Sequence, residues 1–224
     1  MRRAAIIVAG GSGIRMGTEL PKQYLELVGK PLIVHALEKF LLFDASMKVV
    51  VVLAPSHRDH WNAISDKYEL TSWVTVAHGG KCRYDSVNNG LVHVADGMVV
   101  GIHDAVRPLV SQGTLERSYS AAVKWGSGVP VIALEDSVRM LDAAEGSTPV
   151  DRTLLRRVQT PQVFQSSMIK QAYHQISDLE FTDDASVYES LFGHVKLVEG
   201  NPENIKITTP ADLKLATALI QSVD

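Results

Sequence analysis

Two consecutive stretches near the N-terminus decide the fold class: residues 4–9 read AAIIVA, and residues 10–17 read GGSGIRMG. Six apolar residues in a row, with no polar residue at every second position, are typical of a strand covered on both faces, as in a parallel sheet. A glycine-rich loop directly after such a strand lets the backbone approach a phosphate and point its N–H groups at the oxygens. These stretches predict an open α/β sheet with a ligand site at the carboxyl end of its first strand.

The rest of the chain repeats this alternation of short apolar runs and amphipathic stretches. The last amphipathic stretch has a clear start signal, with Thr209 as N-cap, Pro210 at the first helical position and Asp212 three residues after the cap. The alternation indicates a Rossmann-like, doubly wound and mostly parallel α/β sheet in a single domain, residues 1–224. Strands are expected at 4–9, 48–54, 75–77, 98–103, 128–133 and 195–199, and helices at 32–41, 58–68, 86–94, 111–124, 165–176, 183–191 and 210–220.

Residues 135–160 break the alternation, because they are polar and charged and carry no helical stripe. A structureless loop of this length is uncommon in a domain unless it has a function. We therefore expect a β-hairpin or arm that projects from the sheet, and the alternative is a long surface loop.

Composition excludes several classes of protein. The chain has 224 residues, is 46% hydrophobic and 21% charged, and carries a net charge of -3, so it can bury a core and is not disordered. An acidic balance and 6% aromatic residues argue against nucleic-acid and membrane partners. Cys82 is the one cysteine, which excludes a disulfide framework and a cysteine-rich zinc site. No apolar run is long enough for a signal peptide or a membrane span, so we expect a cytoplasmic protein.

The glycine-rich loop matches neither of two common nucleotide-binding motifs. A P-loop needs Gly-Lys-Ser/Thr after four intervening residues, and the dinucleotide fingerprint would need glycine where Met16 stands. A tight turn without a ligand remains the alternative. Arg15 in the loop and Lys22 shortly after it favour a ligand, because two cations beside a phosphate cradle suit a triphosphate that loses pyrophosphate.

The motif Gly-Gly-Ser-Gly-x-Arg-Met-Gly with a following Pro-Lys-Gln resembles the nucleotidylyltransferases. Within them the chain is similar to the family of 2-C-methyl-D-erythritol 4-phosphate cytidylyltransferases of the non-mevalonate isoprenoid pathway. The resemblance covers nearly the whole chain, and the family's motifs occur in order. They are GGKCRYDSV (79–87), HDAVRP (103–108), VDR (150–152), QTPQ (159–162), TDDAS (182–186), EG (199–200) and NIK (204–206).

The resemblance implies a direct displacement in which a phosphate oxygen of methylerythritol phosphate attacks the α-phosphorus of CTP and pyrophosphate leaves. A phosphate is already an anion at neutral pH and needs no general base, which agrees with the lack of a convincing Ser/His/Asp triad among eight scattered histidines. Positioning and charge neutralisation then carry the catalysis. A divalent ion, normally Mg²⁺, would bridge the triphosphate oxygens.

The resemblance also assigns residues to the nucleotide. Arg15 and Lys22 match the family's catalytic cations. The backbone at Ala9, Gly10 and Gly11 is expected to hold the nucleotide, and Gly80 and Ser86 match positions that contact cytosine and the phosphates or ribose. Arg83 lies on the same segment, with a structural ion pair as its alternative. Lys81 and Ile14 depart from the family pattern.

A second group of residues is assigned to the acceptor. Arg152 and Lys206 match the catalytic residues that grip its phosphate, Thr160 and Thr182 match nearby hydroxyl donors, and Ser137 stands where a threonine is common. Asp104 and Arg107 match residues that contact the methylerythritol moiety, and related enzymes use an acid at this position for the metal. Asp104 is therefore also a candidate metal ligand, and a structural ion pair with Arg107 is the alternative. Asp183-Asp184 is interpreted as a helix-start pair that favours the helix dipole.

In the resembled family the arm crosses to a second subunit, so Arg152 would act on the partner's substrate. A homodimer with exchanged arms is therefore the expected unit. Two alternative functions remain: ribitol-5-phosphate cytidylyl transfer, which shares several of these motifs, and a non-catalytic nucleotide-binding module. The VDR and TDDAS motifs favour methylerythritol phosphate, and the retained cations Arg15, Lys22, Arg152 and Lys206 favour catalysis.

Overall fold

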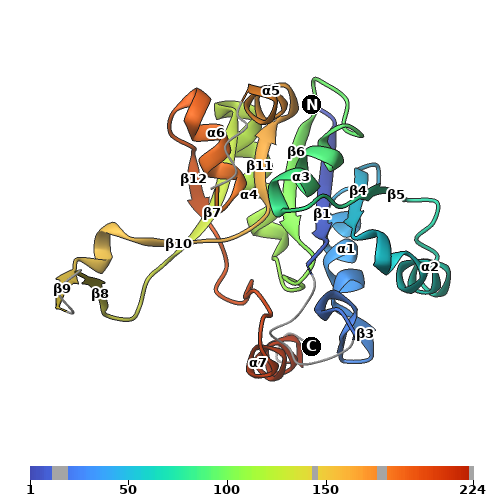
Figure 1. Ribbon diagram of the computed structural model, residues 1–224, viewed down its shortest axis with the longest axis horizontal. Helices are drawn as coiled ribbons and strands as arrows, with labels where there is room; N and C mark the ends of the chain where they lie inside the picture. The colour runs from blue at the N-terminus through green and yellow to red at the C-terminus, as the bar shows by residue number, and fades with distance from the viewer. Residues whose placement is uncertain (12–19, 143–145, 176–180, 222–224) are drawn as a thin grey trace.

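The computed structural model describes residues 1–11, 20–142, 146–175 and 181–221, and a twisted eight-stranded sheet lies at its centre (Figure 1). The strand order is β10-β7-β11-β6-β1-β4-β5, and β12 also pairs with β7. The central strands β6, β1, β4 and β5 are parallel to one another, so their carboxyl ends lie at one edge of the sheet. This confirms the predicted mostly parallel α/β fold.

The sheet strands are β1 (Arg3–Ala9), β4 (Lys48–Leu53), β5 (Val74–His78), β6 (Val99–Asp104), β7 (Ser127–Ala133), β10 (Arg156–Val158), β11 (Gln162–Gln165) and β12 (Leu197–Glu199). The helices are α1 (Leu32–Phe43), α2 (Arg58–Lys67), α3 (Arg83–Leu91), α4 (Gln112–Trp125), α5 (Ser166–Gln175), α6 (Asp184–Phe192) and α7 (Pro210–Gln221). Short 3-10 turns lie at η2 (Lys22–Tyr24), η3 (Pro55–His57) and η4 (Arg152–Leu154).

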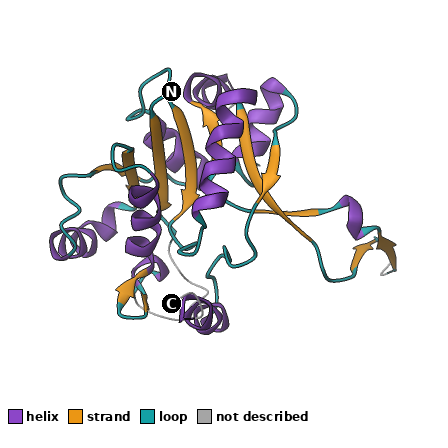
Figure 2. Ribbon diagram, turned by 180° about the vertical axis from the view of Figure 1, so that it is seen from behind, coloured by secondary structure: helices purple, strands orange, loops and turns teal. Residues whose placement is uncertain are grey.

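Helices cover both faces of the sheet, as Figure 2 shows from behind. Successive residues of β1 point to opposite faces, and each face has its own core. Ala5 and Ile7 pack in a cluster that includes residues of α1, α2 and α4. Ala4 and Ile6 pack in a second cluster with residues of α3, α5 and α6. The uninterrupted apolar run at residues 4–9 follows from this burial on both faces.

The starts of α6 and α7 are fixed by side-chain caps. At α7 the Asp212 N–H donates to Thr209 Oγ1 at 3.2 Å, and the Thr209 N–H donates to Asp212 Oδ2 at 2.8 Å, which confirms the start signal in the sequence. At α6 the Asp183 carboxylate accepts the Ser186 N–H at 3.0 Å. Helix α7 packs below the sheet against the short hairpin of β2 (Glu26–Leu27) and β3 (Lys30–Pro31). Its Ala216 belongs to a third small core cluster with Leu27 and Ile207.

Two antiparallel strands were not expected from the sequence. Strand β11 runs antiparallel to both β6 and β7, and β10 runs antiparallel to β7. Both are short, with three and four residues, and β11 begins and ends with glutamine, so neither shows a run or an alternation long enough to indicate a strand. Their backbone hydrogen bonds to β7 and β6 nevertheless join the segment after residue 155 to the sheet.

Residues 135–155 lead away from the sheet (Figure 1). They contain a two-stranded antiparallel hairpin of β8 (Val138–Leu141) and β9 (Ser147–Val150), followed by η4. Leu141 and Leu154 are 82% and 81% exposed, so their apolar side chains find no core within the described part of this chain. The chain then returns to the sheet as β10.

Of the helices that the described residues form, none has the length and apolar character to cross a membrane.

Candidate functional site

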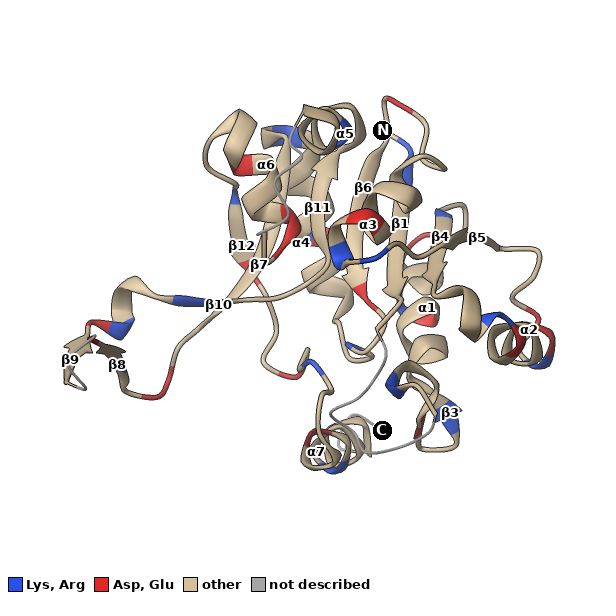
Figure 3. Ribbon diagram, in the orientation of Figure 1, with Lys and Arg blue, Asp and Glu red and all other residues tan. Residues whose placement is uncertain are grey.

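A cavity of about 300 Å³ opens at the carboxyl ends of β1 and β6, beside the start of α3. This is the edge at which the sequence predicts a ligand site. In Figure 3 the basic residues at the start of α3 and on the segment before α7 lie at this end of the sheet. The predicted residues that line the cavity are Ala9, Gly10, Gly11, Lys22, Gly80, Arg83, Ser86, Asp104 and Lys206.

One wall is the turn that leads into α3. The Gly80 N–H donates to Ser86 Oγ at 3.1 Å, and this hydroxyl donates to the Cys82 carbonyl at 2.9 Å. A Cβ on Gly80 would fall 2.1 Å from the Asp85 Cβ, so only glycine fits here. The Lys81 N–H donates to Asp85 Oδ2 at 3.1 Å and closes the turn. The backbone of 79–82 is thereby fixed against the cavity.

The opposite wall joins the end of β1 to η2. A Cβ built on Gly11 would lie 3.8 Å from Lys22 Cε, so the lysine stem lies directly beside the glycine backbone. Gln23 is almost fully buried, and its Nε2 donates to the Ala9 carbonyl at 2.7 Å. The same Nε2 lies 3.2 Å from His57 Nδ1. Gln23 thus ties the turn that carries Lys22 to the end of β1, a role that the sequence analysis did not assign.

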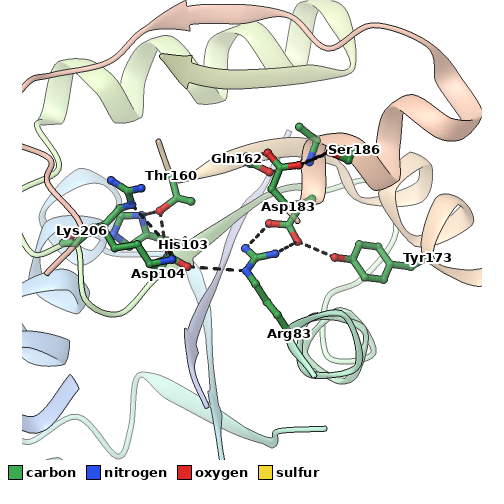
Figure 4. A network of polar contacts seen from close by, with 12 residues as sticks. Arg83, His103, Asp104, Thr160, Gln162, Tyr173, Asp183, Ser186 and Lys206 are labelled. Atoms are coloured by element: carbon green, nitrogen blue, oxygen red, sulfur yellow. Dashed lines mark hydrogen bonds and ion pairs between the residues drawn. The ribbon is translucent and has the colours of Figure 1, made fainter. Parts of the chain in front are cut away.

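Asp104 is the ionic centre of the cavity (Figure 4). Its carboxylate lies 2.9 Å from Lys206 Nζ, 3.5 Å from Arg107 Nε and 3.9 Å from Arg83 Nε. Burial would raise the pKa of Asp104, but the charges of Lys206, Arg83 and Arg107 outweigh burial and hold that pKa well below its ordinary value. Asp104 is therefore ionised at neutral pH and orients Lys206 at the cavity wall.

Arg107 lies behind this carboxylate rather than on the cavity surface. Its Nη1 donates to the Asn204 carbonyl at 2.8 Å, and burial lowers its pKa. Lys206 follows two residues after Asn204, so Arg107 fixes both the acid and the segment that carries the lysine. The structural ion pair considered from the sequence is present.

Thr160 supports Asp104 from the sheet side. Its Oγ1 accepts the Asp104 N–H at 3.1 Å and lies 3.0 Å from His103 Nδ1. His103 Nε2 lies 3.0 Å from the Arg107 carbonyl, and full burial lowers the pKa of His103 to about 4. Thr160 is 6% exposed and does not line the cavity, so within this chain it positions Asp104.

Arg83 is held by a carboxylate that the sequence analysis interpreted differently. Its Nη1 and Nη2 donate to Asp184 Oδ1 and Oδ2 at 2.8 and 2.6 Å, and Asp184 is fully buried. Burial alone would lower the pKa of Arg83, but Asp184 raises it above its ordinary value. Asp183 caps α6 and Asp184 begins it, as expected of a helix-start pair, and Asp184 has the further role of binding Arg83. The two partners are 101 residues apart, so no local sequence signal could have joined them.

Three of the expected acceptor-site residues lie elsewhere. Ser137 and Arg152 are exposed on the projecting segment, and Arg152 Nη1 donates to the Glu135 carbonyl. Neither lines the cavity of its own chain. Thr182 is exposed just before α6. Arg15 lies outside the described residues.

Among the described residues, Asp104 is the one acid that lines the cavity and could contact a metal ion. Within residues 1–11, 20–142, 146–175 and 181–221, no group of three His, Cys, Asp or Glu side chains is arranged to hold a metal. Mg²⁺ is commonly bound by one or two carboxylates together with substrate phosphates and water. The Asp104 carboxylate at the cavity wall fits that mode.

Comparisons with known proteins agree over the length of the chain. The family model described as 2-C-methyl-D-erythritol 4-phosphate cytidylyltransferase matches residues 3–222. Relatives of that name from Bacteroides fragilis and Porphyromonas gingivalis are 48% and 44% identical over 220 and 223 residues. These alignments cover 98% and 99% of this chain and 100% and 99% of the relatives.

Solved structures give the same result. The 4-diphosphocytidyl-2C-methyl-D-erythritol synthase from Anaerococcus prevotii superposes with a TM-score of 0.85 at 26% identity, covering 98% of this chain and 96% of that one. The 2-C-methyl-D-erythritol 4-phosphate cytidylyltransferase from Thermus thermophilus has a TM-score of 0.79 at 30% identity, with 99% and 100% covered.

Proposed function

Because this chain belongs to the 2-C-methyl-D-erythritol 4-phosphate cytidylyltransferase family, we propose that the cavity at the ends of β1 and β6 is where it transfers CMP from CTP to 2-C-methyl-D-erythritol 4-phosphate. The protein is a cytidylyltransferase, and its reaction forms 4-diphosphocytidyl-2-C-methyl-D-erythritol. The observation that carries the assignment is the convergence of Gly10–Gly11, Lys22, the 80–86 turn and the Asp104–Lys206 pair on one cavity.

The chemistry is an in-line displacement at the α-phosphorus of CTP. A new bond forms between an acceptor phosphate oxygen and this phosphorus, and the bond to the bridging oxygen of pyrophosphate breaks. The acceptor oxygen is already anionic, so the protein has no proton to remove. Its task is to hold two anions together and to neutralise the charge that develops on the transferred group and the leaving group.

The residues divide this task between them. The backbone at Ala9–Gly11 and the fixed turn at 80–82 hold the nucleotide, and Ser86 holds that turn in place. Lys22, beside Gly11, and Arg15 neutralise the triphosphate as pyrophosphate leaves. Lys206, oriented by Asp104, faces the acceptor phosphate. Arg83 contributes to the site through its Nε beside Asp104, since its two terminal nitrogens are turned to Asp184.

A divalent ion, normally Mg²⁺, would be held mainly by the CTP phosphates, with Asp104 as the protein's contribution. When bound, it would screen the negative charge of the triphosphate. Arg83, Arg107 and Lys206 already neutralise the Asp104 carboxylate, so the protein without CTP should bind a divalent cation weakly. We therefore expect the ion to bind together with CTP. CTP and the phosphorylated polyol are the proposed partners, and the proposed location is the cytoplasm, where CTP is available.

We further propose a homodimer in which the segment 135–155 of one subunit reaches the cavity of the other. Support comes from the position of Arg152, which is exposed on that segment and does not line its own cavity, and from the exposed Leu141 and Leu154. Ser137 and Arg152 would then contact the partner's acceptor, beside Lys206 and the Thr182 hydroxyl.

Subunit mixing tests the exchanged arm. Arg152→Ala and Lys206→Ala are each expected to inactivate the homodimer. A hybrid dimer keeps one intact site if Arg152 acts on the partner, so random mixing restores about one quarter of the wild-type rate. No recovery after mixing, with hybrids demonstrated by tagged subunits, would place Arg152 in its own site.

The acceptor is tested by pyrophosphate release from CTP and Mg²⁺, with 2-C-methyl-D-erythritol 4-phosphate and ribitol 5-phosphate offered in parallel. Rapid release with the first acceptor and little with the second is expected. Release with ribitol 5-phosphate alone would support the alternative acceptor, and binding of CTP with no release for either acceptor would support a non-catalytic nucleotide-binding module.

A further inference from the structure

Asp184 and Tyr173 form a buried clamp on Arg83. Both guanidinium nitrogens Nη1 and Nη2 are bound by the Asp184 carboxylate at 2.8 and 2.6 Å. The Tyr173 hydroxyl donates to the same carboxylate, to Oδ1, at 2.7 Å. Asp184 is 0% exposed and Tyr173 is 3% exposed, so the hydrogen bond between them is shielded from water. Figure 4 shows Arg83 between Asp104 on one side and Tyr173 on the other.

The clamp is itself fixed to the sheet. Gln162 of β11 donates from Nε2 to Asp183 Oδ2 at 2.8 Å, and its Oε1 accepts the Ala185 N–H at 2.8 Å. These two bonds hold the residues on either side of Asp184. The carboxylate therefore has a position set by the central sheet, not by α6 alone.

Tyr173 also binds the residue next to Arg83. Its ring stacks on Tyr84 with centroids 4.5 Å apart and an interplanar angle of 27°, and the Tyr84 hydroxyl donates to the Tyr173 carbonyl at 2.5 Å. Arg83 and Tyr84 form the first turn of α3, directly after the glycine turn that walls the cavity. One tyrosine thus fixes both the guanidinium and the start of this helix.

The clamp determines what Arg83 can do in the cavity. Nη1 and Nη2 each donate to Asp184, and Nε is the nitrogen that pairs with Asp104, 3.9 Å from Oδ1. Lys206 Nζ forms an ion pair with the other oxygen of Asp104, Oδ2, at 2.9 Å. If Arg83 were released from Asp184, its guanidinium could take Asp104 away from Lys206 or bind the triphosphate directly.

We propose that Asp184 and Tyr173 are positioning residues for cytidylyl transfer, which hold Arg83 beside one oxygen of Asp104 so that the other oxygen orients Lys206 toward the acceptor phosphate. This inference rests on the function proposed above. It extends that function to two buried residues that do not line the cavity.

The Tyr173→Phe variant tests the proposal, because it keeps the stacked ring and removes only the hydroxyl that fixes Asp184. We expect kcat for pyrophosphate release to fall about tenfold, since small misplacements of reacting groups are costly. The KM for CTP and the affinity of CTP alone should change less than about twofold, because the glycine turn stays in place. Asp184→Asn should lower kcat further, about 100-fold, if it folds.

Tyr188→Phe is the matched control. Tyr188 is 3% exposed and belongs to the same core cluster as Tyr173. Its ring stacks on Phe164, and its hydroxyl lies 3.7 Å from Met168 Sδ. The Tyr188→Phe variant therefore loses a buried tyrosine hydroxyl that makes no hydrogen bond to Asp184. Its kcat should stay near that of the wild type, and its thermal unfolding midpoint should report the cost of losing such a hydroxyl.

A fall in kcat confined to Tyr173→Phe, with CTP affinity retained, is the expected result. An unchanged kcat in Tyr173→Phe, or an equal fall in both tyrosine variants, overturns the positioning role. An inactive wild-type enzyme would instead refute the proposed function, so the two failures are distinguishable.

Discussion

Replacing Asp104 by asparagine removes the charge at the centre of the site while keeping the side chain's shape. Lys206 and Arg107 lose their counter-ion, at 2.9 and 3.5 Å, whereas Arg83, 3.9 Å away, keeps Asp184. The amide oxygen of asparagine can still accept one hydrogen bond. The charges of Lys206 and Arg107, however, are then uncompensated in a region where Asp104 is 8% exposed.

The cost to stability comes mainly from Arg107. Its side chain is 12% exposed, whereas that of Lys206 is 42% exposed and screened by solvent, so the lysine pair contributes about 1 kcal/mol or less. Breaking a buried ion pair costs about 3–5 kcal/mol, and the retained amide oxygen places this case near the lower end, at about 3 kcal/mol. For a domain of this size, the melting temperature should fall by about 6–12 °C.

The effect on activity should differ from the effect on CTP binding. Lys206 loses its orienting partner, so kcat for pyrophosphate release should fall about 100-fold or more. The cavity gains positive charge, so the KM for CTP should not rise. Urea unfolding and steady-state pyrophosphate release on the same preparations measure both. A variant as stable as the wild type, or one in which only the KM for CTP is raised, would refute this account of Asp104.

Three further predictions follow from single contacts. Gly80→Ala should weaken CTP binding, measured by titration calorimetry, because the new Cβ meets Asp85 at 2.1 Å; an unchanged affinity would exclude this turn from the nucleotide site. Gln23→Met should lower the free energy of unfolding by about 1–2 kcal/mol and raise the KM for CTP, since the Ala9 carbonyl loses its buried donor; wild-type values of both would contradict it. The His103 imidazole stays neutral in the folded protein down to about pH 4, whereas in the unfolded chain it is protonated below about pH 6.5. Between these pH values the unfolded state binds more protons, so the folded state loses stability as the pH falls. Denaturant midpoints should show a loss of up to about 3 kcal/mol from this group, and His103→Asn should reduce the pH slope; an unchanged slope would contradict the buried neutral imidazole.

The elements that could be predicted from the sequence are those with a local signal of their own. Strand β1 and helix α7 were placed to within a residue, because an apolar run buried on both faces and a complete capping box are local signals. Strands β10 and β11 were missed, because segments of three and four residues are too short to show a pattern of their own before they pair with β7 and β6.

The candidate site shows the same division. Residues at or directly after the carboxyl ends of strands, such as Asp104 and Gly10, could be predicted because all parallel strands end at the same edge of the sheet. Gln23 and Asp184 act through partners 14 and 101 residues away, so their roles appear only when the chain is folded. The contribution of Arg152 depends on a second subunit and stays a prediction.

The rate of pyrophosphate release by Lys22→Met, measured with CTP, Mg²⁺ and 2-C-methyl-D-erythritol 4-phosphate, tests most directly that this cavity is the site of cytidylyl transfer. Lys22 lies beside Gly11 on the cavity wall, and methionine keeps the length of its stem without the charge. We predict a fall in kcat of about 100-fold to 1,000-fold with an unchanged unfolding midpoint. A folded variant that releases pyrophosphate within about threefold of the wild-type rate would contradict the assignment of the cavity.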